Sequence, residues 1–173
     1  MPLIRCTQRL LKELGTSKAE LVEKAQDAGL LGDWYATLLR VDRRKCILFT
    51  NARTLYAFVV PAVRKDMLKA FVEFFCTHLE ENLRAEGFPN GTIRLVLDAH
   101  QELQIGKTKS KSVLGSMNDC AYRFEYHVAW EGGLMYIDAI EVNKQLNIAP
   151  MNAIGYSSGI KELKRQLEGY VIK

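Results

Sequence analysis

The residues with the clearest potential for chemistry lie between Lys107 and His127, in the sequence KTKSKSVLGSMNDCAYRFEYH. A helix turns by about 100° per residue, so a helix over this stretch gathers its polar side chains on one stripe. This stripe consists of Ser112, Ser116, Asp119, Arg123 and His127, and the opposite face is apolar, with Val113, Leu114, Met117, Cys120, Ala121, Phe124 and Val128. Side chains that could bind or react with a ligand therefore share one surface.

The start of this helix is a candidate anion site. Lys111 and Ser112 stand where free backbone amides would meet a phosphate or carboxylate, and Lys107 and Lys109 would add positive charge. Gly115 lies inside the helix and not in a loop before it, so the sequence contains no Walker-type phosphate cradle. The alternative is that Ser112 only caps the helix.

A second basic cluster, at Arg43 and Arg44, could act with these lysines, and Trp34, Tyr122 and Tyr126 could stack on bases. The net charge of +4 permits contact with phosphates without requiring it, and both clusters could instead be solvated turns. The favoured hypothesis is a non-catalytic binding module for nucleic acid or another phosphate-bearing ligand, with no cofactor and no metal. The expected ligand-binding residues are Arg43, Arg44, Lys107, Lys109, Lys111, Ser112, Ser116, Asn118, Asp119 and Arg123.

An enzyme is a different hypothesis, as a hydrolase or nuclease built around Asp119 and a histidine. Ser116 and His127 are about 16 Å apart along one helix, so they cannot pair directly. His78 or His100 would have to approach from elsewhere. A protein-binding regulator is a further alternative.

The segment SVLGSMND could also be structural. Gly115 would then let another backbone approach closely, and Asn118 and Asp119 would hold a neighbouring loop such as NIAPMNAIGY. In that case Gly115→Leu is expected to abolish folding.

The hydrophobic pattern predicts one α+β domain over residues 1–173, a small antiparallel β-meander covered by several helices. The predicted strands are residues 3–6, 34–41, 45–50, 54–60 and 103–108. The predicted helices are residues 8–14, 18–28, 64–86, 93–100 and 137–147, a helix from about Ser112 to Gly132, and one starting near Ser158.

Cysteine usage and hydropathy predict a cytoplasmic protein with no membrane partner. Cys6, Cys46, Cys76 and Cys120 are widely spaced in apolar surroundings, which is typical of buried free thiols. The charged start MPLIRCTQRLLKEL does not resemble a signal peptide, and no apolar run approaches the roughly 20 residues that span a bilayer. An exposed strand edge and the face of the helix at 64–86 leave a homodimer open.

The chain resembles a bacterial family known as a domain of unknown function. The resemblance rests on IRCTQRLLKEL, GDWYATLL, DRRKCILFTNARTLYAFVVP, KTKSKSVLGSMND and NKQLNIAPMNAIGY, in this order. It implies a cytoplasmic bacterial protein with a single α+β domain, and it implies no activity, cofactor or partner. The region between the first helix and Trp34, which contains the predicted helix at 18–28, is longer here than in the family pattern.

Overall fold

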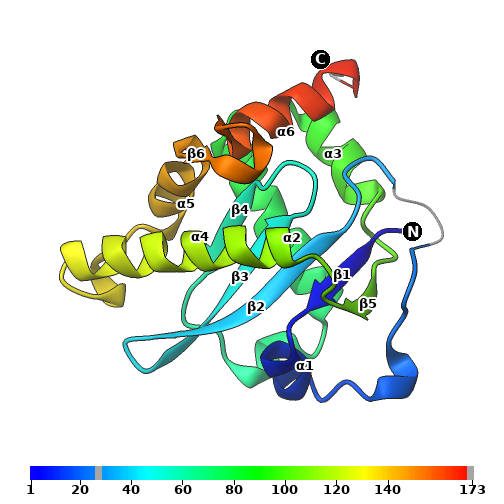
Figure 1. Ribbon diagram of the computed structural model, residues 1–173, viewed down its shortest axis with the longest axis horizontal. Coiled ribbons are helices and arrows are strands. Elements are labelled where there is room, and N and C mark those ends of the chain that lie inside the picture. Colours follow the sequence, from blue (N-terminus) through cyan, green and yellow to red (C-terminus); the bar gives the residue numbers. More distant parts are fainter. Residues whose placement is uncertain (26–28, 171–173) are drawn as a thin grey trace.

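The computed structural model describes residues 1–25 and 29–170, and in this part of the chain the main sheet has five strands in the order β4-β3-β2-β1-β5 (Figure 1). β2 (Trp34–Val41), β3 (Arg44–Asn51) and β4 (Ala57–Val60) form the predicted antiparallel meander, with β3 in the middle. β1 (Leu3–Cys6) lies between β2 and β5 (Gln104–Lys107) and runs parallel to both.

The expectation of a purely antiparallel sheet is therefore wrong, because the sheet is mixed. The α+β class and the meander are confirmed. Parallel neighbours need a long crossover connection, and the segment that contains α1 (Gln8–Leu14) supplies one between β1 and β2. The pairing of β1 with β5 joins residues about a hundred positions apart.

One face of the sheet is covered by α1, α2 (Phe71–Ala85), α3 (Asn90–Asp98) and α6 (Gly159–Leu167). Aromatic rings dominate this core: Trp34 and Phe49 each lie 5.1 Å, centroid to centroid, from Phe75 of α2. Cys6 and Leu10 are buried in the same layer. This layer confirms that the apolar periodicity around residues 71–83 belongs to a core helix.

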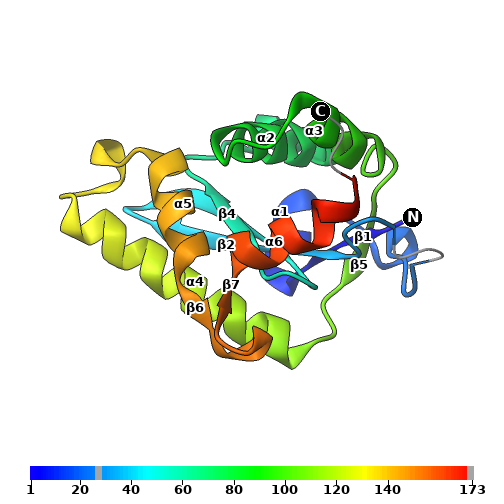
Figure 2. The same ribbon diagram turned by 90° about the horizontal axis from the view of Figure 1, so that it is seen from above.

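The opposite face is covered by α4 (Lys111–Trp130), as Figure 2 shows, and α5 (Ala139–Ile148) packs into the same apolar layer from the β4 edge. The predicted apolar face of α4 is confirmed, since Met117, Cys120 and Phe124 are almost completely buried against the sheet. α4 begins beside β1 and β5 and ends near the turn between β2 and β3 (Figure 1). The helix therefore spans the sheet from one side to the other.

Short elements complete the fold. They are η1 (Lys18–Glu20), η2 (Lys65–Leu68), η3 (Leu134–Tyr136), η4 (Asn152–Ile154), η5 (Glu168–Tyr170) and the paired strands β6 (Pro150–Met151) and β7 (Ser157–Ser158). The helix predicted over 64–86 is divided into η2 and α2. The predicted helix at 18–28 is wrong for its described part: the Ser17 and Glu20 capping box forms, but the chain is extended at Leu21. Residues 26–28 lie outside the described residues.

The free edge of β4 is bonded by two asparagine side chains of α5. The Asn147 amide accepts from the backbone N–H of Ala57 (2.8 Å) and donates to its carbonyl (2.6 Å). Asn143, one turn earlier, makes the same pair of bonds with Val59 (2.8 and 3.2 Å). Because alternate residues of a strand point their backbone groups the same way, asparagines at i and i+4 satisfy this edge. The segment NKQLN is thus structural, and the β4 edge is not open for dimerisation.

The cysteines are free thiols among the described residues, as predicted, with Cys6, Cys46 and Cys120 buried and Cys76 half-buried. Burial raises the pKa of the Cys76 thiol to about 11. Among residues 1–25 and 29–170, no helix has the length and hydropathy required to cross a bilayer.

Candidate functional site

A buried arginine lies where β1, β2 and β5 meet. Arg5 stands level with Tyr35 of β2 and Gly106 of β5 in the strand register. Strand alternation sends its neighbours Ile4 and Cys6 into the core beneath α2 and directs Arg5 toward the α4 side. Only 7% of Arg5 is exposed, so its charge requires partners.

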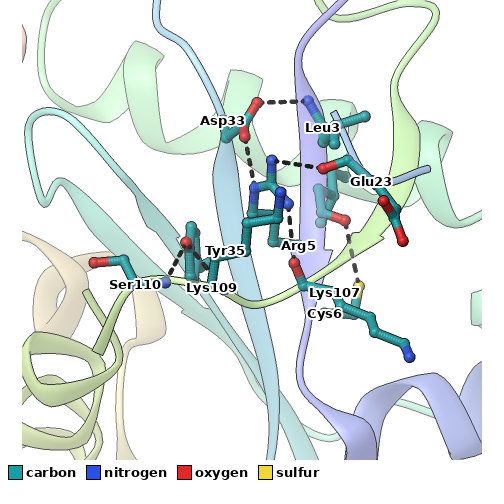
Figure 3. Close-up of polar contacts among 10 residues, drawn as sticks. Leu3, Arg5, Cys6, Glu23, Asp33, Tyr35, Lys107, Lys109 and Ser110 are labelled. Atoms are coloured by element: carbon teal, nitrogen blue, oxygen red, sulfur yellow. Dashed lines mark hydrogen bonds and ion pairs between the residues drawn. The ribbon is translucent and has the colours of Figure 1, made fainter. Parts of the chain in front are cut away.

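Three acceptors from separate parts of the chain bind the Arg5 guanidinium (Figure 3). Its Nε donates to Asp33 Oδ2 at 2.6 Å, its Nη1 to the Lys107 carbonyl at 3.0 Å, and its Nη2 to the Glu23 carbonyl at 3.5 Å. Asp33 also accepts from the backbone N–H of Leu3 (3.0 Å). A buried ion pair is tolerated when further hydrogen bonds satisfy its remaining groups, and these bonds hold the arginine in one position.

Gly106 provides the space for this arrangement. A Cβ atom at this position would lie 2.7 Å from the Val22 carbonyl oxygen and 3.6 Å from Arg5 Nη1. The Val22 N–H donates to the Ile105 carbonyl (2.9 Å), so residues 21–23 run along the outer edge of β5. These contacts replace the helix predicted here, because pairing with β5 offers the backbone bonds that a helix would have made internally.

Tyr35 fixes the start of α4 above the arginine. Its hydroxyl accepts from the backbone N–H groups of Ser110 (3.0 Å) and Lys109 (3.4 Å), as Figure 3 shows. The helix cap is Ser110, whose Oγ accepts from the Val113 N–H at 3.2 Å. The alternative in which Ser112 caps the helix is therefore wrong; Ser112 is an exposed residue of the first turn.

A pocket of about 350 Å³ opens over Arg5. It is lined by Arg5, Lys18, Leu21, Val22, Glu23, Lys107, Thr108 and Lys109. Of the described lining residues, four are cationic and one is acidic, so the pocket carries an excess of positive charge. It lies at the carboxyl ends of the parallel strands β1 and β5, the edge at which open α/β sheets bind ligands. We call this feature the Arg5 pocket.

A larger depression of about 600 Å³ lies on the opposite side of the sheet. It is lined by Ala70, Phe71, Val72, Glu73, Cys76 and Gln101. Among the described lining residues, Glu73 is the only one with a formal charge, and the surface is mainly apolar. Convergent polar groups distinguish a ligand site, and the Arg5 pocket has them whereas this depression does not.

The sequence profile of one protein family matches residues 3–162, nearly the whole chain, and its description is "Domain of unknown function (DUF6933)". The chain belongs to the DUF6933 family. No curated protein and no solved structure matches this chain. Membership confirms the resemblance to an uncharacterised family, and it carries no activity, substrate or partner.

In this DUF6933 domain the two basic clusters predicted from the sequence lie apart. Lys107 and Lys109 line the Arg5 pocket, and Lys111 is exposed in the first turn of α4. Arg43 and Arg44 lie at the β2–β3 turn, where the neighbouring Asp42 accepts from the Leu134 N–H just beyond the other end of α4. α4 has 20 residues and is about 30 Å long, so the clusters cannot hold one small ligand together.

The polar stripe of α4 is only partly available to a ligand. Asn118 and Asp119 are exposed, whereas Ser116 is buried. Arg123 packs onto the last turn of α5 and the segment after it, donating to the Leu146 carbonyl (3.4 Å) and Met151 Sδ (3.0 Å). The predicted contact of α4 with NIAPMNAIGY therefore exists. Arg123 makes it, whereas the sequence predicted that Asn118 and Asp119 would.

Burial raises the pKa of the Cys120 thiol beneath Arg123, and the nearby guanidinium opposes that rise. The predicted close approach of another backbone to Gly115 is wrong. Among the described residues, only the helix itself lies within 4 Å of a Cβ placed there, and Gly115 faces solvent.

The structure brings no histidine to Asp119 within the described residues. His127 is eight residues further along α4, about 12 Å away. His78 packs against Phe74 of α2, on the other side of the sheet, and is half-buried beside Glu81. His100 is buried in the core beneath α2, where it bonds Trp34 and the Val96 carbonyl. In the described residues no group of His, Cys, Asp and Glu side chains is arranged to hold a metal ion.

Sequence reasoning missed Arg5, Lys18, Asp33 and Tyr35. One signal was present: Arg5 interrupts the otherwise apolar strand LIRC, and a charge within a buried strand requires a partner. The partners themselves come from residues 23, 33 and 107, and no local pattern connects them.

Proposed function

We propose that this protein is a non-catalytic binding module that holds a phosphate group in the Arg5 pocket. The observation that carries the proposal is the ring of cationic side chains, Lys18, Lys107 and Lys109, around a fixed, buried Arg5. In a partly enclosed pocket, such charges attract an anion more strongly than the same charges in free solution.

The lysines support an external ligand because no acidic side chain in the described part of the chain pairs with them. Among the described residues, Lys18, Lys107 and Lys109 form no ion pair, whereas Arg5 is paired with Asp33. Arg5 is thus held in one position at the base of the pocket, and the lysine side chains can move to contact an anion. Lysine binds phosphate as a mobile point charge, which suits this division of roles.

The phosphate could belong to a small metabolite, a nucleotide or a nucleic acid strand. The chemistry at the pocket is the same for all three. Cellular phosphate ligands are abundant in the cytoplasm, and the free cysteines are in keeping with a reducing compartment. The test must therefore separate the sources of phosphate.

The experiment is fluorescence anisotropy of labelled single-stranded DNA and RNA oligonucleotides over a series of salt concentrations. Three lysine contacts give a slope of log K against log salt of about −2 for a single strand. In Lys107→Ala/Lys109→Ala the slope is expected to fall to about −0.7, since one lysine remains. Unlabelled inorganic phosphate and a nucleoside monophosphate are added as competitors.

Arg43→Ala/Arg44→Ala is the matched control, because it removes the same charge at the far end of α4. Unchanged binding in this control, together with weaker binding in the lysine variant, supports the Arg5 pocket. Equal weakening in both variants would mean diffuse charge attraction and would contradict the proposal. Displacement by inorganic phosphate or the monophosphate indicates a small ligand, whereas binding of the oligonucleotide that resists both indicates a strand.

Absence of binding by every probe at low salt would also refute the proposal. If the oligonucleotide becomes shorter during the titration, the protein cleaves it, and the proposal that the protein is non-catalytic would be contradicted. Circular dichroism of each variant must match the parent protein, so that a loss of binding is not a loss of folding.

A further inference from the structure

The charged residues that line the Arg5 pocket do not cancel one another. The lining lysines are Lys18, Lys107 and Lys109. None of these lysines forms an ion pair in the described part of the chain, and Glu23 is the one acidic residue among the described lining residues. The charge of Arg5 is balanced by Asp33, whose Oδ2 lies 2.6 Å from Arg5 Nε. Three positive charges and one negative charge leave a net charge of +2 for an anion to neutralise.

A net charge of +2 matches a phosphate monoester. A phosphate held by one ester bond carries about −1.5 to −2 at pH 7, because its second pKa is about 6. Each phosphodiester inside a nucleic acid strand carries a single negative charge, so it would leave part of the pocket's charge unbalanced. This difference has a larger effect in a partly enclosed pocket than in water. The charge count therefore favours a terminal phosphate over a phosphate within a strand.

Arg5 has donors left for such a group. A guanidinium has five N–H donors. Nε, Nη1 and Nη2 of Arg5 each use one of them on a protein acceptor (Figure 3). One N–H on Nη1 and one on Nη2 therefore have no acceptor in residues 1–25 and 29–170. A guanidinium commonly binds two oxygens of one phosphate, and a monoester offers three such oxygens.

The pocket has room for more than the phosphate. Its volume of about 350 Å³ is at the small end of the range for small-molecule sites. Four phosphate oxygens take roughly the space of four water molecules, about 120 Å³, so more than half of the pocket is left for an organic group. Leu21 and Val22, both half-buried, offer it apolar contact. The Glu23 carboxylate and the Thr108 hydroxyl can form hydrogen bonds with its hydroxyl groups.

We propose that the Arg5 pocket binds the phosphate monoester of a small hydroxylated molecule, either a nucleoside monophosphate or a sugar phosphate. The phosphate lies against Arg5 and is neutralised by the three lysines. Glu23 accepts a hydrogen bond from a hydroxyl of the organic group. This inference rests on the proposed function and names the class of ligand for the same pocket.

The test is isothermal titration calorimetry of the full chain at pH 7.5. The probes are adenosine 5′-monophosphate, glucose 6-phosphate and, as the matched ligand control, adenosine 3′,5′-cyclic monophosphate. The cyclic compound has the same base and sugar, but it is a diester with one negative charge. At least one monoester is expected to bind at least tenfold more tightly than the cyclic diester, and the tighter of the two monoesters identifies the source of the phosphate.

The pH dependence of binding provides a second readout. Between pH 7.5 and 5.5 the doubly charged fraction of a monoester falls about fourfold, so its affinity is expected to fall by about the same factor. The cyclic diester keeps its charge over this range. It therefore reports any change that comes from titration of Glu23, Asp33 or other protein groups. An equal pH dependence for both ligands would contradict the proposal.

A lysine variant tests the charge count itself. Lys109→Ala lowers the net charge of the lining residues by one, so the preference for the monoester over the cyclic diester is expected to fall at least threefold. Lys12→Ala is the matched control, because Lys12 is an exposed lysine of α1 that does not line the pocket, and the preference is expected to stay unchanged. Circular dichroism must show that both variants are folded.

The outcomes separate this inference from the proposed function. If the cyclic diester or an oligonucleotide without a terminal phosphate binds as tightly as the monoesters, the inference is wrong while the phosphate site stands. If the preference for the monoester survives Lys109→Ala unchanged, the inference is also wrong. If no phosphate compound binds at all, both proposals fail.

Discussion

Replacing Asn147 by alanine is expected to destabilise this protein strongly, because one amide satisfies two buried backbone groups of an edge strand. Asn147 accepts from the Ala57 N–H (2.8 Å) and donates to the Ala57 carbonyl (2.6 Å), and both residues are almost completely buried. An orphaned buried polar group costs about 1–3 kcal/mol, so two of them cost about 4 kcal/mol. For a domain of this size the melting temperature would fall by roughly 8–16 °C.

The assay is urea unfolding followed by circular dichroism. Gln145→Ala is the control, since Gln145 is exposed on the same helix, and its effect is expected to stay within about 0.5 kcal/mol. Asn147→Asp has nearly the same shape but replaces the donor with a carboxylate facing the carbonyls of Ala57 and Asn143, so it should also be severe. A cost below about 1 kcal/mol for Asn147→Ala would refute the view that α5 completes the β4 edge.

Two other predictions concern folding. Gly115→Ala is expected to stabilise the protein by about 0.5–1 kcal/mol in the same urea assay, because the site is exposed in the middle of α4 and no described residue outside the helix lies within 4 Å of the added carbon. Destabilisation would show that a neighbour occupies that space. His100 is buried, and this burial lowers its pKa, while Trp34 Nε1 donates to its Nε2 and its Nδ1–H donates to the Val96 carbonyl (3.0 and 2.6 Å). Below about pH 6.5 the unfolded chain therefore takes up a proton before the folded one, so the free energy of unfolding decreases as the pH falls. His100→Gln should lessen this decrease between pH 7 and 5, and an equal decrease in both proteins would contradict the assignment.

Secondary structure that depends on neighbouring residues could be predicted from the sequence. The strand at Leu3–Cys6 and the helix at Gln8–Leu14 form as expected, with Gly15 in the left-handed conformation after the helix. The apolar faces of α2 and α4 also follow from their periodicity. Where the prediction failed, at residues 21–25, the capping signal was real, but a hydrogen bond to β5 determined the path of the chain.

In the candidate site, too, local features could be predicted from the sequence and long-range ones could not. The lysines at 107 and 109 were identified from the sequence because a basic run at a helix start is a local pattern. Their separation from Arg43 and Arg44 could not be predicted, since it depends on how α4 lies across the sheet. The sequence predicted that α4 contacts the β6 segment through Asn118 and Asp119. The contact exists, and Arg123 makes it.

The sequence by itself determined the helices outside residues 18–28, the meander, the free thiols and one helix with a polar and an apolar face, because each depends on residue types within a few turns or one hairpin. Only the tertiary structure decided that β1 and β5 join the meander in parallel, which buries Arg5 among groups from residues 23, 33 and 107. A buried charge can pair only with groups that lie close to it in space, and long-range strand pairing determines which groups these are.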